Sequence, residues 1–171
     1  MTTSDARNLI EGAVTKKEQS DWVDLGCGSG TFAYALAGLL DDGSRIFAVD
    51  RLHQYLKSKQ GNVSIEFTKA DFEKQELHFA NISGIVLANS LHYIEDQLGL
   101  IVRIKPWLKE GGKIILIEYD TDEHNPWVPY PITFEKATAI FDSAGFNQVV
   151  KIGELSSRIR KETIFSCVAT L

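Results

Sequence analysis

Cysteine is scarce in this chain, which has only Cys27 and Cys167 among its 171 residues. The two lie far apart in sequence, so they form no Cys-x-x-Cys pattern of the kind that binds a metal. Cys27 lies inside a glycine-rich stretch, where we expect it to be simply a small side chain that fits the glycine loop. The sequence places no base beside it that would make its thiolate a nucleophile.

Clustered metal ligands of other kinds are also lacking. The four histidines are scattered along the chain. Asp96, Asp120 and Asp122 carry carboxylates, but no pair of histidines with the spacing of metal ligands lies near them in the sequence. The sequence therefore predicts no metal site.

Long apolar runs and a basic excess are missing as well. No stretch of about 18 apolar residues and no signal-peptide pattern is present, so we expect a cytoplasmic protein without a membrane partner. The net charge of −5 argues against nucleic acid as a main partner, because phosphate binding needs clustered lysine and arginine. Length and an ordinary composition predict one globular domain over residues 1–171, with an N-terminal helical segment over residues 1–20.

The most informative stretch covers residues 21–40, DWVDLGCGSGTFAYALAGLL. Residues 22–25 are typical of a short buried strand, three glycines follow at alternate positions, and residues 31–40 predict a helix with Ser29 as its N-cap. A strand, a glycine turn and a helix in this order hold nucleotide-like ligands at the edge of an open α/β sheet. Glycine permits positive φ and a close approach of ligand to backbone.

Two details narrow the choice of ligand. Thr31 stands where the dinucleotide pattern G-x-G-x-x-G needs its third glycine, and no Lys-Ser or Lys-Thr follows to make a P-loop. Asp24 lies two residues before the first glycine, where a carboxylate would repel a pyrophosphate and suit a cation. S-adenosylmethionine carries a sulfonium cation, an ammonium group and no phosphate.

The string VDLGCGSG at residues 23–30 resembles the class I S-adenosylmethionine-dependent methyltransferases. Residues 108–113, LKEGGK, and residues 143–149, SAGFNQV, are similar to the same family. The resemblance implies an α/β fold, a doubly wound, Rossmann-like sheet of seven strands that is mostly parallel with an antiparallel last strand. It also implies S-adenosylmethionine as the cofactor.

The rest of the chain fits such a fold. Short apolar runs predict further strands over residues 44–50, 63–69, 84–88 and 114–117, and a short connection makes residues 149–155 and 163–171 an antiparallel pair. Helices are expected from residue 4 or 5 to 17, over 51–59, over 95–107, and over 134–144 with Thr133 as N-cap. Residues 108–113 are expected to turn, and prolines exclude regular structure from residues 121–131.

The cofactor site follows from these elements. Asp50 ends the second strand, where a carboxylate accepts hydrogen bonds from both ribose hydroxyls, although it could also be a plain exposed strand end. The resemblance implies that Asp71 accepts the adenine amino group with Phe72 beside it; a helix cap is the alternative role for Asp71. The predicted cofactor residues are Asp24, Gly26, Cys27, Gly28, Gly30, Asp50, Arg51, Leu52, Asp71, Phe72 and Asn89.

Methyl transfer is a direct displacement, so a base is needed only where the acceptor must lose a proton. His92 is the first candidate, because it follows the fourth strand and a free imidazole has a pKa of about 6.5; an ordinary hydrogen-bonded histidine is the alternative. Tyr119 is the second candidate. The predicted lining of the acceptor pocket is Tyr93, His124, Trp127 and Tyr130.

The sequence thus predicts methyl transfer from S-adenosylmethionine to a small-molecule acceptor. A regulatory module that binds the cofactor without turnover is an alternative, and an NAD-dependent oxidoreductase is a weaker one, since the glycine pattern and Asp24 oppose it. Few residues are left to cap the site, so a homodimer partner could complete it.

Overall fold

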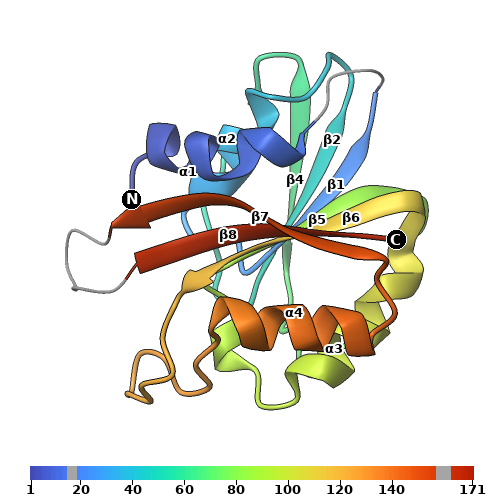
Figure 1. Cartoon of the computed structure of the whole chain (residues 1–171). Helices are drawn as coiled ribbons and strands as arrows, with labels where there is room; N and C mark the ends of the chain where they lie inside the picture. The colour runs from blue at the N-terminus through green and yellow to red at the C-terminus, as the bar shows by residue number, and fades with distance from the viewer. Residues whose placement is uncertain (15–18, 157–162) are drawn as a thin grey trace.

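The computed structural model describes residues 1–14, 19–156 and 163–171. Its centre is an eight-stranded sheet in the order β3-β4-β2-β1-β5-β6-β8-β7 (Figure 1). The strands are β1 Asp21–Leu25, β2 Arg45–Asp50, β3 Lys59–Gln60, β4 Val63–Lys69, β5 Ile82–Ala88, β6 Leu108–Tyr119, β7 Gln148–Ser156 and β8 Thr163–Thr170.

Helices cover both faces of this sheet. The helices α1 (Thr3–Ile10) and α2 (Thr31–Ala37) lie on one face, and α3 (Gln97–Ile104) and α4 (Phe134–Ser143) on the other (Figure 1). Each pair closes its own apolar core, so the middle strands are buried on both sides. None of the described helices is long and apolar enough to cross a membrane.

The central strand β1 fixes the topology. It pairs in parallel with β2 on one side and with β5 on the other. The chain therefore winds outward through β2 and β4 and then returns to continue through β5 and β6. In such sheets a ligand binds outside the carboxyl ends of the strands at the point where the order reverses, here between β1 and β5.

The doubly wound α/β fold and the reversed last strand are confirmed, and the strand count is corrected. The strand β8 runs antiparallel to both β6 and β7. The eighth strand is β3, a two-residue strand antiparallel to β4 at the sheet edge, which the expected count of seven does not include.

The helix expected over residues 51–59 is wrong. Residues 51–58 form a loop, and Lys59 begins β3. Polar side chains take up the backbone amides there: Leu52 N–H donates to Asp50 Oδ1 at 2.8 Å, and Lys57 N–H donates to the Tyr34 hydroxyl at 2.9 Å. The Leu52 bond would also fit the start of a helix, but the Tyr34 hydroxyl withdraws the Lys57 amide from the carbonyl that a helix would offer it.

Two helix starts also differ from expectation. The N-cap of α2 is Gly30 at φ +83°, with no side-chain hydrogen bond, so Ser29 does not cap the helix. The N-cap of α1 is Thr2, whose hydroxyl accepts from the Asp5 amide while the Asp5 carboxylate accepts from the Thr2 amide. The helix α1 ends at Ile10, a short 3-10 turn continues to Ala13, and the expected end at Lys17 lies outside the described residues.

Three further boundaries shift. The helix α2 ends at Ala37 rather than at residue 40. The helix expected over 95–107 divides into α3 and a 3-10 turn over Lys105–Trp107, because Pro106 lacks the amide that a longer helix would use. The expected turn at 108–113 is the irregular start of β6, with Gly111 at φ +68°. Thr133 caps α4 as expected.

Gly84 offers a test of the sheet packing. A Cβ atom on Gly84 would lie 2.2 Å from the Trp22 ring, which packs across from it on β1. We expect Gly84→Ala to lower the free energy of unfolding by about 1–3 kcal/mol through overpacking. Gly12→Ala is the control, since its Cβ would meet Ile152 at an ordinary 3.7 Å and should change stability by less than about 0.5 kcal/mol. Urea unfolding compares the two, and equal stabilities would contradict the packing described.

Candidate cofactor and active site

A cavity of about 270 Å³ opens at the carboxyl ends of β1, β2, β4 and β5. It lies at the point where the strand order reverses, where the topology predicts a ligand. Its volume is just below the roughly 300–1,000 Å³ that is typical of small-molecule sites. It is lined by Gly26, Gly28, Asp50, Arg51, Leu52, Gln54, Asp71, Phe72, Glu73, Asn89, Ser90, Tyr93 and Ile94.

The glycine turn after β1 forms the floor of this cavity. A Cβ atom on Gly26, at φ +83°, would lie 2.5 Å from the Ser90 Cβ, so only glycine lets the turn approach the next loop. Gly28, at φ +49°, has no atom within 4 Å of the place of its Cβ. The open space above Gly28 allows a ligand to lie directly on the backbone.

Asp50 connects the end of β2 to this turn. One carboxylate oxygen accepts from the Gly28 amide at 2.9 Å and the other from the Leu52 amide at 2.8 Å. A carboxylate has about four lone-pair positions. Each oxygen therefore keeps room for one more donor from the cavity side, such as a hydroxyl group.

Asp71 and Phe72 follow β4 and form another wall. The Asp71 carboxylate accepts from the Glu73 amide at 3.1 Å, which makes it the start of a turn as well as a cavity residue. The Phe72 carbonyl accepts from the Arg103 guanidinium at 2.5 Å, which holds the loop against α3. Both residues predicted for the adenine end thus lie at the cavity, and the capping alternative for Asp71 applies to a turn rather than to a helix.

Asp24 lies beneath the glycine turn, not in the cavity wall. Its side chain is 1% exposed, and neither carboxylate oxygen has a hydrogen-bond partner among the described residues. Burial raises the pKa of Asp24 to about 7, with a further increase from the Asp50 charge, while the nearby Ala33 amide opposes the shift. The carboxyl group is therefore poised to exchange a proton near neutral pH.

Cys27 and Gly30 also support the turn from below. The Cys27 amide donates to the Val49 carbonyl at 3.0 Å, and the Gly30 amide donates to the Cys27 carbonyl at 2.9 Å. Burial and the nearby Asp24 and Asp50 charges raise the pKa of the Cys27 thiol, which disfavours a thiolate. The two residues shape the turn without lining the cavity.

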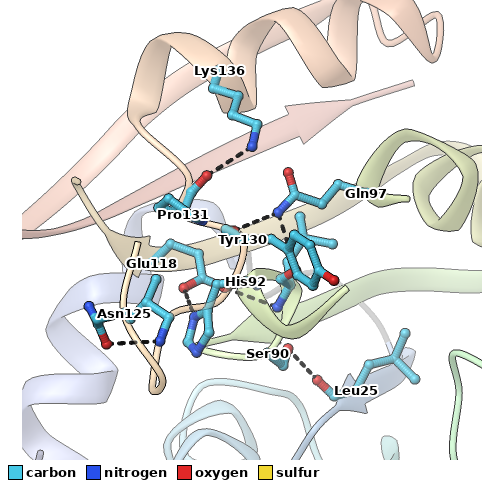
Figure 2. A network of polar contacts seen from close by, with 11 residues as sticks. Leu25, Ser90, His92, Gln97, Glu118, Asn125, Tyr130, Pro131 and Lys136 are labelled. Carbon is cyan, nitrogen blue, oxygen red and sulfur yellow. Dashed lines mark hydrogen bonds and ion pairs between the residues drawn. The ribbon is translucent and has the colours of Figure 1, made fainter. Parts of the chain in front are cut away.

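The loop after β5 is the wall on the far side of the cavity. Asn89 adopts φ +49°, and its side-chain oxygen is buried without a partner in the described structure. The Ser90 hydroxyl donates to the Leu25 carbonyl at 2.8 Å (Figure 2). The Asn89 amide donates to the Ile117 carbonyl at 2.8 Å. The loop is thus fixed to β1 on one side and to β6 on the other.

His92 is held by Glu118, which lies near the end of β6. Its Nδ1 lies 2.5 Å from Glu118 Oε2, and the two side chains are 3% and 1% exposed (Figure 2). The other oxygen, Glu118 Oε1, accepts from the amides of Leu91 at 3.0 Å and His92 at 3.2 Å. His92 Nε2 is buried and has no partner among the residues described.

The residues predicted to line an acceptor pocket do not gather in this cavity. Tyr93 lines it, and its ring packs on His92 with the centroids 4.3 Å apart. Tyr119, the second candidate for the base, is half-buried at the end of β6, opposite Ile164 of β8. His124 binds the Pro129 carbonyl within its own loop at 2.7 Å, and Trp127 is 69% exposed.

Tyr130 ties its loop to the neighbouring elements through its backbone. Its amide donates to the His92 carbonyl at 2.9 Å, and its carbonyl accepts from Gln97 Nε2 at 2.8 Å (Figure 2). The Glu95 carboxylate raises the pKa of the Tyr130 phenol above its usual value, so the phenol stays neutral. Loop 121–131 is therefore attached to the wall that carries His92.

Sequence reasoning missed five residues of this region. Ser90 and Ile94 lie beside predicted residues in the string after β5, and that position was a usable signal. Gln54 and Glu73 lie in loops with no motif to mark them. Glu118 directly follows the strand expected over residues 114–117, but a strand pattern does not show which buried partner a carboxylate will bind.

The described residues contain no group of three or more histidine, cysteine or acidic side chains that could hold a metal ion. Two of the scattered acids have other contacts: Asp96 caps α3 through the Gly99 amide at 2.8 Å, and Asp120 accepts from the Phe134 amide at 3.0 Å.

The burial of Asp24 has a consequence for the pH dependence of stability. Because its pKa is higher in the folded chain than in the unfolded chain, the folded chain binds the extra proton between about pH 4 and pH 7. This contribution is fully present at low pH and is lost as the pH rises through about 7. We expect the stability of Asp24→Asn relative to wild type to increase by about 2–3 kcal/mol from pH 5 to pH 8. Urea unfolding at both pH values measures this, with the exposed Asp122→Asn as control, and an unchanged difference would contradict it.

Comparison with known families agrees with this geometry. Residues 23–116, more than half of the chain, match the family profile of a methyltransferase domain. Phosphoethanolamine N-methyltransferase 3 of Arabidopsis thaliana is 29% identical over 137 residues, which are 73% of this chain and 28% of that protein. Carboxy-S-adenosyl-L-methionine synthase of Pseudomonas aeruginosa is 27% identical over 144 residues, which are 75% of this chain and 58% of that protein. The chain thus spans less than two thirds of either relative.

Solved structures share the fold. The 1,6-didemethyltoxoflavin-N1-methyltransferase of Burkholderia thailandensis, solved with 1,6-didemethyltoxoflavin and S-adenosylhomocysteine, superposes with a TM-score of 0.74 at 17% identity, over 98% of this chain and 77% of that one. A SAM-dependent methyltransferase of Aquifex aeolicus gives a TM-score of 0.66 at 18% identity, over 99% and 98% of the two chains. By the family match and this shared fold, the chain belongs to the methyltransferase domain family, and the resemblance to class I S-adenosylmethionine-dependent methyltransferases is confirmed.

Proposed function

We propose that the chain binds S-adenosylmethionine in the cavity at the ends of β1, β2, β4 and β5 and transfers its methyl group to a small-molecule acceptor. The observation that carries this proposal is the open glycine turn at Gly28 with the Asp50 carboxylate beside it. A backbone without side chain next to a carboxylate with free lone pairs suits a nucleoside whose ribose hydroxyls donate to that carboxylate.

The polar and apolar groups around the cavity support the same ligand. Asn89 has a buried side-chain oxygen without a described partner, and a buried acceptor of this kind calls for a donor from a ligand or from water. Phe72 and Leu52 line the same cavity as the Asp50 and Asp71 carboxylates and provide apolar surface for the adenine. When bound, the cofactor would supply a methyl group activated by its sulfonium: the acceptor would bond to the methyl carbon, and the carbon–sulfur electron pair would leave with the neutral thioether.

The charges near the glycine turn argue against a pyrophosphate ligand such as NAD. Asp24 and Asp50 both lie beside this turn, and each interacts with the other through its charge. A pyrophosphate at Gly28 would lie next to these two acidic groups, whereas a cationic ligand would be attracted by them.

A small acceptor fits the relatives and the charge of the chain. The net charge of −5 leaves little basis for nucleic-acid recognition. One relative is named for an N-methyltransferase of phosphoethanolamine and the other for a carboxylated S-adenosylmethionine, and both names describe small molecules. Because the chain spans only part of each relative, neither name identifies the acceptor.

The cofactor assignment can be tested by calorimetry with S-adenosylmethionine, S-adenosylhomocysteine and NAD. We expect micromolar binding of either sulfur compound, weakened about 10–100-fold in Asp50→Ala because charged hydrogen bonds to the ribose are lost. Asp142→Ala, an exposed change on α4, is the control that should bind as wild type does. Binding of NAD with no response to either sulfur compound would refute the proposal.

The role of His92 is tested by turnover. Because a general base contributes about 10²–10⁴-fold, we expect His92→Ala to lower kcat by that factor on an acceptor whose reacting atom loses a proton. Affinity for S-adenosylhomocysteine should change little, since His92 lies outside the cavity lining. Unchanged turnover would remove His92 from this role, and Tyr119 would be the next candidate. Cofactor binding without turnover on any acceptor would favour the regulatory module instead.

A further inference from the structure

The Glu118 side chain contacts both the backbone and a side chain of the loop at the active-site edge. Its Oε1 accepts from the amides of Leu91 and His92, and its Oε2 lies 2.5 Å from Nδ1 of the His92 ring. It is 1% exposed, so these contacts form away from water. A buried carboxylate that holds both a loop backbone and an imidazole couples the two in one geometry.

The direction of these contacts determines the proton on the ring. Oε1 faces two backbone amides, which can only donate, and a carboxylate in this position acts as an acceptor on its second oxygen too. His92 Nδ1 then carries the hydrogen, and Nε2 is left with its lone pair. Nε2 is also the ring atom that is buried without a partner among the described residues.

We propose that Glu118 is a positioning residue that fixes His92 in the Nδ1–H tautomer and thereby leaves the lone pair of Nε2 as the proton acceptor. This proposal rests on the methyl transfer proposed above. As the acceptor atom bonds to the methyl carbon, the proton that it carried passes to Nε2, and Glu118 keeps its hydrogen bond to Nδ1. The imidazolium that forms is stabilised by the adjacent carboxylate, as in other carboxylate–histidine pairs.

The same residue fixes the cavity wall. The segment after β5 carries Asn89, Ser90 and Tyr93 into the cavity, and the end of β6 holds it through Ile117 and Glu118. On its other side the His92 carbonyl accepts from the Tyr130 amide (Figure 2). Glu118 therefore links the cofactor wall to loop 121–131 through His92.

Glu118→Gln separates the two roles. The glutamine oxygen can replace Oε1 and accept from the Leu91 and His92 amides, which forces its NH₂ group toward the ring. That NH₂ donates to Nδ1, so the ring proton must move to Nε2 and the lone pair is lost from that atom. The wall should remain in place while the tautomer is reversed.

Long-range ¹H–¹⁵N correlation spectra of the full chain labelled in histidine report the tautomer directly. The chain has four histidines, so the His92 signals can be assigned with a His92→Gln sample. We expect hydrogen on Nδ1 in the wild type and on Nε2 in Glu118→Gln. A wild-type ring with hydrogen on Nε2 or on both nitrogens near neutral pH, or a variant with the wild-type tautomer, would overturn the proposal.

Binding and turnover complete the test. We expect Glu118→Gln to bind S-adenosylhomocysteine within about threefold of wild type and to lose about 100-fold or more in kcat, whereas a purely structural contact predicts wild-type turnover for so close an isostere. Glu110→Gln makes the same change at the exposed far end of β6 and should leave tautomer, binding and turnover unchanged. Wild-type turnover in Glu118→Gln refutes the positioning role alone. Failure of the wild type to bind S-adenosylhomocysteine refutes the proposed function instead, while the tautomer can still be read.

Discussion

The parallel pairing of β1 with both β2 and β5 is the constraint on which the rest of this molecule depends. Because parallel strands end at one edge of a sheet, the glycine turn after β1, Asp50 after β2 and Asn89 after β5 meet there although they are far apart in sequence. The two helical layers make this arrangement rigid by burying β1 and β5 on both faces. Residues with no local reason to be neighbours thus line one cavity.

The glycine turn shows how close packing and chemistry share the same residues. Gly26 must be glycine because the Ser90 side chain occupies the place of its Cβ, whereas Gly28 leaves that place open toward the cavity. Two carboxylates lie around this turn, and they differ by environment. Asp50 is bound by two amides, while Asp24 is buried without a described partner and has its pKa raised to about 7. Asp50 therefore has lone pairs free for a ligand. Asp24 is a buried charge above neutral pH, and this charge destabilises the folded chain.

On the opposite wall, the end of β6 organises the loop that carries His92. Backbone and side-chain acceptors of Ile117 and Glu118 take up the amides of Asn89, Leu91 and His92, so the irregular loop is satisfied without regular structure. The contact of Tyr130 with His92 extends this network to the loop with most of the aromatic side chains expected near an acceptor. Rigid support of this kind is what positioning for a displacement reaction requires.

The sequence by itself determined the glycine turn and most of the strands, because strand periodicity and glycine spacing are local signals that survive without the tertiary structure. Its resemblance to class I S-adenosylmethionine-dependent methyltransferases implied the doubly wound fold and the adenine role of Asp71. The helix predicted over residues 51–59 was wrong because the distant Tyr34 hydroxyl binds the Lys57 amide, and the predicted Ser29 cap was wrong because α2 begins one residue later, at the left-handed Gly30. The sequence could not show that Asp24 lies below the cavity or that the Glu118 carboxylate contacts the His92 ring. Which side chain a buried group meets depends on strands that approach from distant parts of the chain, and only the folded sheet brings them together.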